Sequence, residues 1–164
     1  MTTIAPILPA PIKKTIEVRA SVDLAFRIFT GDMTSWWELE SHHIGKVKAV
    51  EAIMEPRAGG RWYERGEDGS ECDWGRVLSW DPPHRVLLTW QIGADWQFDP
   101  KLHTEVEVRF VEAGNGVTRV ELEHRMLDAY GEKAAEMRTI FDSEGGWPRV
   151  LEQFARRANE LAAS

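Results

Sequence analysis

Two pairs of chemically versatile side chains lie close together near the start of the sequence. The stretch GDMTSWWELESHHIG, residues 31–45, contains the adjacent tryptophans Trp36 and Trp37 and the adjacent histidines His42 and His43. Two neighbouring side chains on a regular strand or helix cannot both point into one core, so we expect at least one indole to face a cavity, a groove or solvent. The histidines raise the question of a metal site or a proton-transfer site.

The histidine pair lacks the spacing of a metal site. On an extended chain His42 and His43 point to opposite sides, so a metal ion would need further ligands from elsewhere. The sequence contains no HxH, HExxH or CxxC motif. Its single cysteine, Cys72, lies between Glu71 and Asp73, two acids that raise a thiol pKa. We therefore expect no metal, no cofactor and no internal disulfide.

The other candidates for acid–base chemistry are His124 and Glu64. His124 follows the strand alternation of Val120 and Leu122, which predicts either a polar group in a pocket or a core histidine bonded to a neighbour. Glu64 shares the alternation of Trp62 and either enters a cavity, where burial would raise its pKa, or lies at a solvated sheet edge. No nucleophile stands beside a base at a diagnostic spacing, so no catalytic residue is assigned.

These residues belong to a chain whose pattern is strand, two helices, further strands and a final helix. Residues 12–20 alternate as a half-buried strand, and Ser21 can cap a helix that ends at Gly31, before a short helix from Thr34. Six strand-like runs follow in residues 47–126, separated by the turn sequences PRAGG, GEDGS, DPPH and AGNG. Short turns make successive strands antiparallel. The connection GADWQFDPKLH is too long for a tight hairpin, so we expect a functional loop there.

The last part of the chain predicts a long amphipathic helix. Its apolar stripe, at helical spacings of four and three, consists of Trp147, Leu151, Phe154, Ala158 and Leu161. Two glycines precede this stripe, and Pro148 suits the first turn of a helix that begins at Trp147. A sheet that is polar on one side must cover its other face, and this helix is the element long enough to do so.

The predicted fold class is therefore α+β, a helix-grip fold. We expect a curved antiparallel sheet of about six or seven strands wrapped around the long C-terminal helix, with two short helices after the first strand. Residues 1–11 contain three prolines and no periodicity, which indicates a flexible lead-in, and residues 12–164 form a single domain.

Composition narrows the classes of partner. The 164 residues carry a net charge of −7, and lysine and arginine form no cluster larger than an adjacent pair such as Arg156 and Arg157, which argues against nucleic acid as a partner. No apolar stretch approaches the length that crosses a bilayer, so we expect no membrane partner and a cytoplasmic location. The sequence leaves open whether the protein is a homodimer.

One family resemblance covers residues 12–162 of the chain. The run PRAGGRWYERGEDGSECDWGRVLSWDPPHRVLLTW, together with GGWPRVLEQFARR near the end, resembles the bacterial branch of the heat-shock-protein-90 ATPase activator homologue family. That family lies within the START-like or Bet v 1-like (SRPBCC) helix-grip superfamily. The resemblance implies a cavity between the sheet and the long helix. The superfamily includes lipid and hormone binders, polyketide cyclases, dehydratases and co-chaperone domains, so the fold does not decide the function.

Strand alternation combined with this fold predicts an apolar and aromatic cavity lining. The predicted ligand-binding residues are Trp36, Trp37, Trp62, Trp74, Trp90, Trp96, Phe98, Val106, Val108, Phe110, Leu122, His124, Trp147 and Leu151. Such a lining favours a small hydrophobic or aromatic molecule with few hydrogen-bonding groups. For each tryptophan, packing in the core is the alternative.

Three functions are consistent with this description. The first is non-catalytic binding of a small hydrophobic or aromatic ligand. The second is a cyclase-like or hydratase-like enzyme in the same cavity, which requires His124, Glu64 or Tyr130 to converge on one point. The third is a stress-related chaperone partner, which requires an exposed apolar patch on the outside of the molecule.

Overall fold

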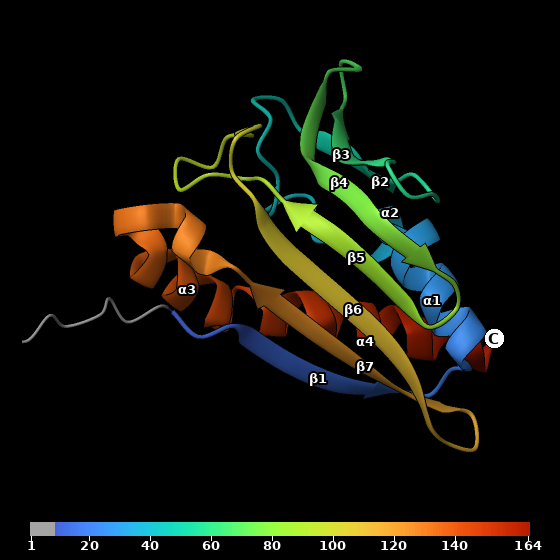
Figure 1. Ribbon diagram of the computed structural model, residues 1–164. Coiled ribbons are helices and arrows are strands. Elements are labelled where there is room, and N and C mark those ends of the chain that lie inside the picture. Colours follow the sequence, from blue (N-terminus) through green and yellow to red (C-terminus); the bar gives the residue numbers. More distant parts are fainter. Residues whose placement is uncertain (1–8) are drawn as a thin grey trace, which may run out of the picture.

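The strands form one curled antiparallel sheet (Figure 1). The computed structural model describes residues 9–164. The seven strands, in chain order, are β1 (Ile12–Val18), β2 (Ala49–Met54), β3 (Arg61–Gly66), β4 (Glu71–Asp81), β5 (Arg85–Trp90), β6 (Thr104–Gly114) and β7 (Val117–Arg125). Their order across the sheet is β1-β7-β6-β5-β4-β3-β2, and all neighbouring pairs are antiparallel. This confirms the predicted sheet.

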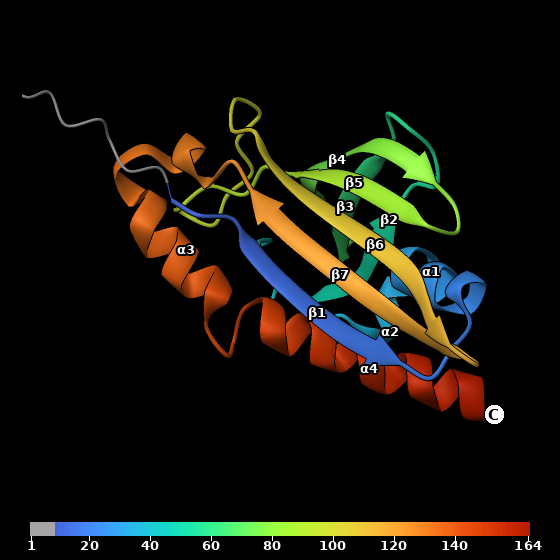
Figure 2. The ribbon, with the colours of Figure 1, turned by 60° about the horizontal axis from the view of Figure 1, so that its bottom comes forward.

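Helices pack against one face of the sheet. They are α1 (Val22–Gly31), α2 (Met33–Trp36), the 3-10 helix η1 (Leu127–Lys133), α3 (Ala134–Asp142) and α4 (Trp147–Ala163). The Ser21 hydroxyl accepts a hydrogen bond from the backbone of Leu24, as the predicted cap of α1. Figure 2 shows α4 running along β1 toward α1. The fold is therefore the predicted helix-grip fold. None of the helices in residues 9–164 is long and apolar enough to cross a membrane.

Helix α4 buries the predicted stripe. It begins at Trp147, directly after Gly146, with a proline in its first turn. Its inner side chains Trp147, Leu151 and Phe154 are buried, and Phe154 is fully covered. The Phe154 ring meets the rings of Phe29 on α1 and Trp36 on α2 with centroids 5.2 and 5.3 Å away. The helix therefore joins the sheet and both short helices in one core.

The inward side chains of the central strands form rows across the sheet. Val108 on β6 lies between Val86 on β5 and Leu122 on β7. The predicted inward positions Trp90, Val106, Val108, Phe110, Val120, Leu122 and His124 are all buried, and so are Val86 and Leu88, which share the alternation of Trp90. Alternation thus identified the inner face of these strands correctly.

Ion pairs cover the opposite face of the sheet. The carboxylate of Glu107 on β6 pairs with Arg85 on β5 and, at 3.0 Å, with Arg125 on β7. Partial burial raises the pKa of Glu107, but hydrogen bonds from these arginines outweigh that effect and lower it to about 2. Glu107 is therefore charged at neutral and mildly acidic pH.

The predicted lead-in is described only in part, because residues 1–8 lie outside the described residues. The backbone carbonyls of Ala10 and Pro11 accept hydrogen bonds from Arg138 on α3, at 2.7 and 3.4 Å. This end of the lead-in is thus attached to the helical layer, directly before β1.

Candidate functional site

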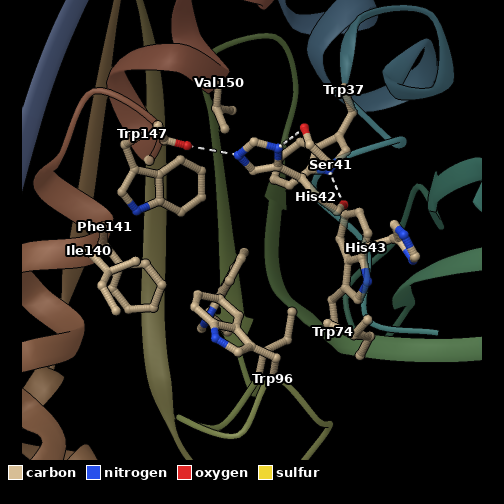
Figure 3. Close-up of a pocket in the computed structure, with 15 residues that line it drawn as sticks. Trp37, Ser41, His42, His43, Trp74, Trp96, Ile140, Phe141, Trp147 and Val150 are labelled. Carbon is tan, nitrogen blue, oxygen red and sulfur yellow. Dashed lines mark hydrogen bonds between the residues drawn. The ribbon is translucent and has the colours of Figure 1, made fainter. Parts of the chain in front are cut away.

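A cavity of about 350 Å³ lies where α4 begins, between α3, the sheet and the segment that follows α2 (Figure 3). This volume falls at the lower end of the range of roughly 300–1,000 Å³ typical of ligand pockets. The lining residues are Trp37, Ser41, His42, His43, Ile44, Trp74, Trp90, Ile92, Trp96, Ile140, Phe141, Gly145, Gly146, Trp147 and Val150. Most of them are apolar or aromatic, in agreement with the predicted character of the lining.

Five of the lining side chains are tryptophans, namely Trp37, Trp74, Trp90, Trp96 and Trp147. The Trp37 indole nitrogen donates to the backbone carbonyl of His42 (2.9 Å), and the Trp74 indole nitrogen donates to Oε1 of Glu64 (2.8 Å). The Trp147 indole nitrogen donates to Nδ1 of His124 (3.0 Å). These bonds fix the rings of Trp37, Trp74 and Trp147 and occupy their donors, so that their ring carbons remain available to a ligand. The indole nitrogen of Trp90, in contrast, is buried and has no partner among the described residues.

His124 is a buried member of the core behind Trp147. Trp147 donates its indole hydrogen to His124 Nδ1 at 3.0 Å, so the imidazole hydrogen sits on Nε2. That nitrogen donates to Thr104 Oγ1 at 2.9 Å, and the threonine hydroxyl donates to the backbone carbonyl of Trp90. Burial lowers the pKa of His124 to about 3, so the ring is neutral. Of the two predictions for this residue, the core histidine is the one the structure shows.

Glu64 is buried, so the prediction of a solvated sheet edge is wrong. Its carboxylate accepts hydrogen bonds from the backbone of Ile44 (2.6 Å) and Gly45 (3.2 Å) as well as from Trp74. A side chain at position 45 would meet Glu64 Oε2 at 3.1 Å, which explains the glycine there. Glu64 therefore anchors the segment before β2 to β3, and it does not line the cavity.

We expect Glu64→Gln to loosen this segment. The amide places an N–H group against the N–H donors of Ile44, Gly45 or Trp74, so one buried donor loses its partner, a loss of roughly 1–3 kcal/mol. Hydrogen exchange at Ile44 and Gly45 should accelerate accordingly. Glu51→Gln, which neutralises an exposed carboxylate on β2, is the matched control. Unchanged exchange at both amides in Glu64→Gln would contradict the anchor role.

Ser41, His42 and His43 supply the hydroxyl and imidazole groups of the lining. His42 Nε2 lies 2.8 Å from the carbonyl oxygen of Gly145, and His42 Nδ1 lies 2.7 Å from Ser41 Oγ. A carbonyl only accepts, so Nε2 carries the hydrogen and Nδ1 accepts from the serine hydroxyl. His43 Nδ1 lies 3.1 Å from the backbone carbonyl of Gly45 and donates to it. Within residues 9–164, no cluster of three or more His, Cys, Asp or Glu side chains could hold a metal ion.

An ion pair next to the cavity ties the same segment to α4. Arg149 donates to both carboxylate oxygens of Glu38, at 3.0 and 3.2 Å. The hydrogen bond from Arg149 holds the pKa of Glu38 below its usual value, and the charge of a protonated His42 acts in the same direction. The segment from Trp37 to Gly45 is therefore held by β3 on one side and by α4 on the other.

The adjacent tryptophans have different surroundings. Trp37 lines the cavity, whereas Trp36 is buried between α1 and α4 and donates its indole hydrogen to the backbone carbonyl of Ile28 at 2.9 Å. The predicted lining residues Trp62, Val106, Val108, Phe110, Leu122, His124 and Leu151 also lie in the core and not in the cavity wall. Phe98 borders a separate shallow pocket beside Cys72.

His124, Glu64 and Tyr130, the residues considered for an enzyme, are each hydrogen-bonded to other parts of the protein. The Tyr130 hydroxyl donates to the backbone carbonyl of Ile92 at 2.6 Å. His124 and Glu64 bond to other partners, and no hydrogen bond connects any two of these three side chains. Sequence reasoning missed Ser41, Ile140, Phe141, Gly145 and Val150 as lining residues. Val150 could have been predicted as a lining residue, because it lies three positions after Trp147 and therefore on the same face of the helix.

The curled sheet, the long helix and the cavity beside it define a helix-grip protein of the Bet v 1-like superfamily, a fold that binds ligands. A family model described as activator of Hsp90 ATPase homolog 1-like protein matches residues 19–159, and the chain belongs to this family.

Solved structures carry the comparison further. The anthrahydroquino-γ-pyrone synthase Txn09 is 39% identical, with a TM-score of 0.64, over 93% of this chain and 99% of that one. The self-sacrificing resistance protein CalC from Micromonospora echinospora is 30% identical, with a TM-score of 0.71, over 94% and 97% of the two chains. Protein NE0264 from Nitrosomonas europaea shares the fold at 15% identity, with a TM-score of 0.65, over 94% of this chain and 97% of its own. No curated protein matches the chain.

Proposed function

We propose that the protein binds a planar aromatic small molecule in the tryptophan-lined cavity. The observation that carries this proposal is the set of indoles whose N–H groups are bonded to the protein while their rings line the cavity. Such a wall offers stacking and edge contacts to a flat ring system and few hydrogen bonds. Ser41, His42 and His43 add the hydroxyl and imidazole groups of the wall.

The relatives support a fused aromatic ligand. Txn09 is named for an anthrahydroquinone-derived product and is similar to this protein over nearly the whole of both chains. Burial of about 300 Å² of apolar ligand surface would contribute roughly 7 kcal/mol before the entropy of association is subtracted. Shape therefore supplies most of the affinity, and the polar groups orient the ligand.

Filling the cavity tests the binding site directly. We expect Val150→Trp to weaken binding of 2-hydroxyanthraquinone by about tenfold or more, because the new indole occupies the space of the ligand. Quenching of tryptophan fluorescence and calorimetry measure the affinity. Val50→Trp adds the same side chain at an exposed position on β2 and is the matched control. Equal affinity of both variants would refute this location, provided that both melt cooperatively.

Ring-closing catalysis is the second candidate function, and the 39% identity to a synthase favours it. His124 and Glu64 are not available as its acid or base, because their acceptor and donor positions are already occupied by the protein. A catalytic role therefore requires a different proton acceptor in the cavity wall.

A further inference from the structure

Ser41 and His42 form a hydrogen-bonded pair that opens onto the cavity. In Figure 3 the His42 ring is bonded on both sides, to Ser41 on its own segment and to the turn between α3 and α4. The turn contributes the carbonyl of Gly145, which is a lining residue like Ser41 and His42. The pair therefore connects two separate parts of the cavity wall.

The direction of these hydrogen bonds places the unprotonated nitrogen of His42, Nδ1, next to the Ser41 hydroxyl. Because Gly145 fixes the hydrogen on Nε2, the lone pair of Nδ1 is available to receive a proton from Ser41 Oγ. The serine hydroxyl has one other neighbour, the carbonyl of Glu38, at 3.5 Å, too far for a strong bond. Ser41 is exposed, so its oxygen can still accept a hydrogen bond from a ligand.

Titratable and charged side chains surround the His42 ring. The titratable and charged side chains on the segments that meet at this ring are Glu38, Glu40, His43, Glu64, Glu144 and Arg149. Glu38 interacts with the charge of His42, and Arg149 holds Glu38 in place. His43 Nδ1 donates to the backbone carbonyl of Gly45, so its ring does not form the link to Ser41 that the His42 ring forms.

We propose that Ser41 and His42 remove the proton from a phenolic hydroxyl of the bound aromatic ligand. The ligand O–H bond breaks and its proton moves to Ser41 Oγ, while the serine proton moves to His42 Nδ1 and forms an N–H bond. The electron pair stays on the ligand oxygen, so the products are a phenolate and an imidazolium, and no further reactant is needed. This inference rests on the proposed function. It identifies the ligand class as a hydroxylated aromatic, and the phenolate is the nucleophile that a ring closure onto a nearby carbonyl would require.

An optical titration tests this step, because phenol ionisation shifts the absorption of 2-hydroxyanthraquinone to longer wavelength. At one pH unit below the pKa of the free dye, the wild-type protein should bind it as the phenolate. Ser41→Ala and His42→Gln should bind it as the neutral phenol, so that the fraction ionised falls by about tenfold. His84→Gln removes a histidine outside the cavity and should behave as the wild type.

Anthraquinone, which lacks the hydroxyl, separates binding from proton transfer. It should bind the wild type and His84→Gln with similar affinity, and any loss of its affinity in Ser41→Ala or His42→Gln measures what the substitution does to the cavity wall alone. A neutral spectrum of the dye bound to the wild type, or a phenolate fraction in both variants equal to that of the wild type, overturns the proton-transfer inference while the proposed function stands. Binding of neither compound to the wild type overturns both. Since Ser41 is exposed, Ser41→Ala keeps the test informative even if His42→Gln disturbs the cavity wall.

Discussion

Replacing Phe154 with alanine should lower the free energy of unfolding by about 3–5 kcal/mol. The side chain is fully buried in the middle of α4, and its ring contacts Phe29 and Trp36. The substitution leaves a hole at the point where α1, α2 and α4 meet, and rings held by several neighbours cannot collapse into it. Urea denaturation at neutral pH measures the loss.

Leu161→Ala is the control for Phe154. Leu161 belongs to the same apolar stripe but lies near the end of α4 and is only partly buried. It should therefore cause a clearly smaller loss than Phe154→Ala. A loss below about 1 kcal/mol for Phe154→Ala would show that the ring faces open space and that α4 is not the centre of the core.

Acidification should destabilise the protein through His124 before it affects the carboxylates. The unfolded chain binds a proton at this residue below its ordinary pKa of 6.5, whereas the native state does not until about pH 3. Stability therefore falls as the pH drops through this window, by up to roughly 1.4 kcal/mol for each pH unit. Glu107, whose ordinary pKa is 4.5, contributes only below that value. Between pH 6.5 and pH 4.5 we expect His124 to account for a loss of roughly 2–3 kcal/mol.

Urea titrations at several pH values separate these contributions. His124→Gln should be less stable than the wild type at neutral pH, because Trp147 and Thr104 lose good partners, yet its stability should change little between pH 6.5 and 4.5. Glu107→Gln should retain the slope in this window and lose part of it at lower pH. An unchanged slope in His124→Gln would assign the pH dependence to other groups.

The strands and the final helix were predictable because each has a simple period. The apolar stripe through Phe154 follows from the helical period, and the alternation through Val108 and His124 follows from the strand period. Both periods can be read directly from the sequence. The same alternation cannot tell a packed inner face from a cavity wall. Val108 points inward as predicted, but Val86 and Leu122 fill the space beside it.

The cavity itself depends on contacts between distant irregular segments. The carbonyl that orients His42 belongs to Gly145, 103 positions further along the chain. The backbone amides of Gly45 and Ile44, which donate to the Glu64 carboxylate, lie 19 and 20 positions before it, in a segment without periodicity. Neither contact produces a repeat in the sequence that periodicity could detect. The segment with the adjacent tryptophans and histidines could therefore be identified from the sequence, but the residues that it contacts could not.

The close packing of the indoles also gives the protein a collective optical property. The ring centroids of Trp37 and Trp74 are 4.9 Å apart, those of Trp62 and Trp74 5.4 Å, and those of Trp90 and Trp147 5.5 Å. At such separations the electronic transitions of neighbouring indoles couple, and excitation is shared among several rings. The native protein should therefore show an exciton couplet in its ultraviolet circular dichroism that reports on the arrangement of the aromatic cluster rather than on backbone conformation. A flat chromophore in the cavity would join this coupled system and acquire an induced circular dichroism band of its own.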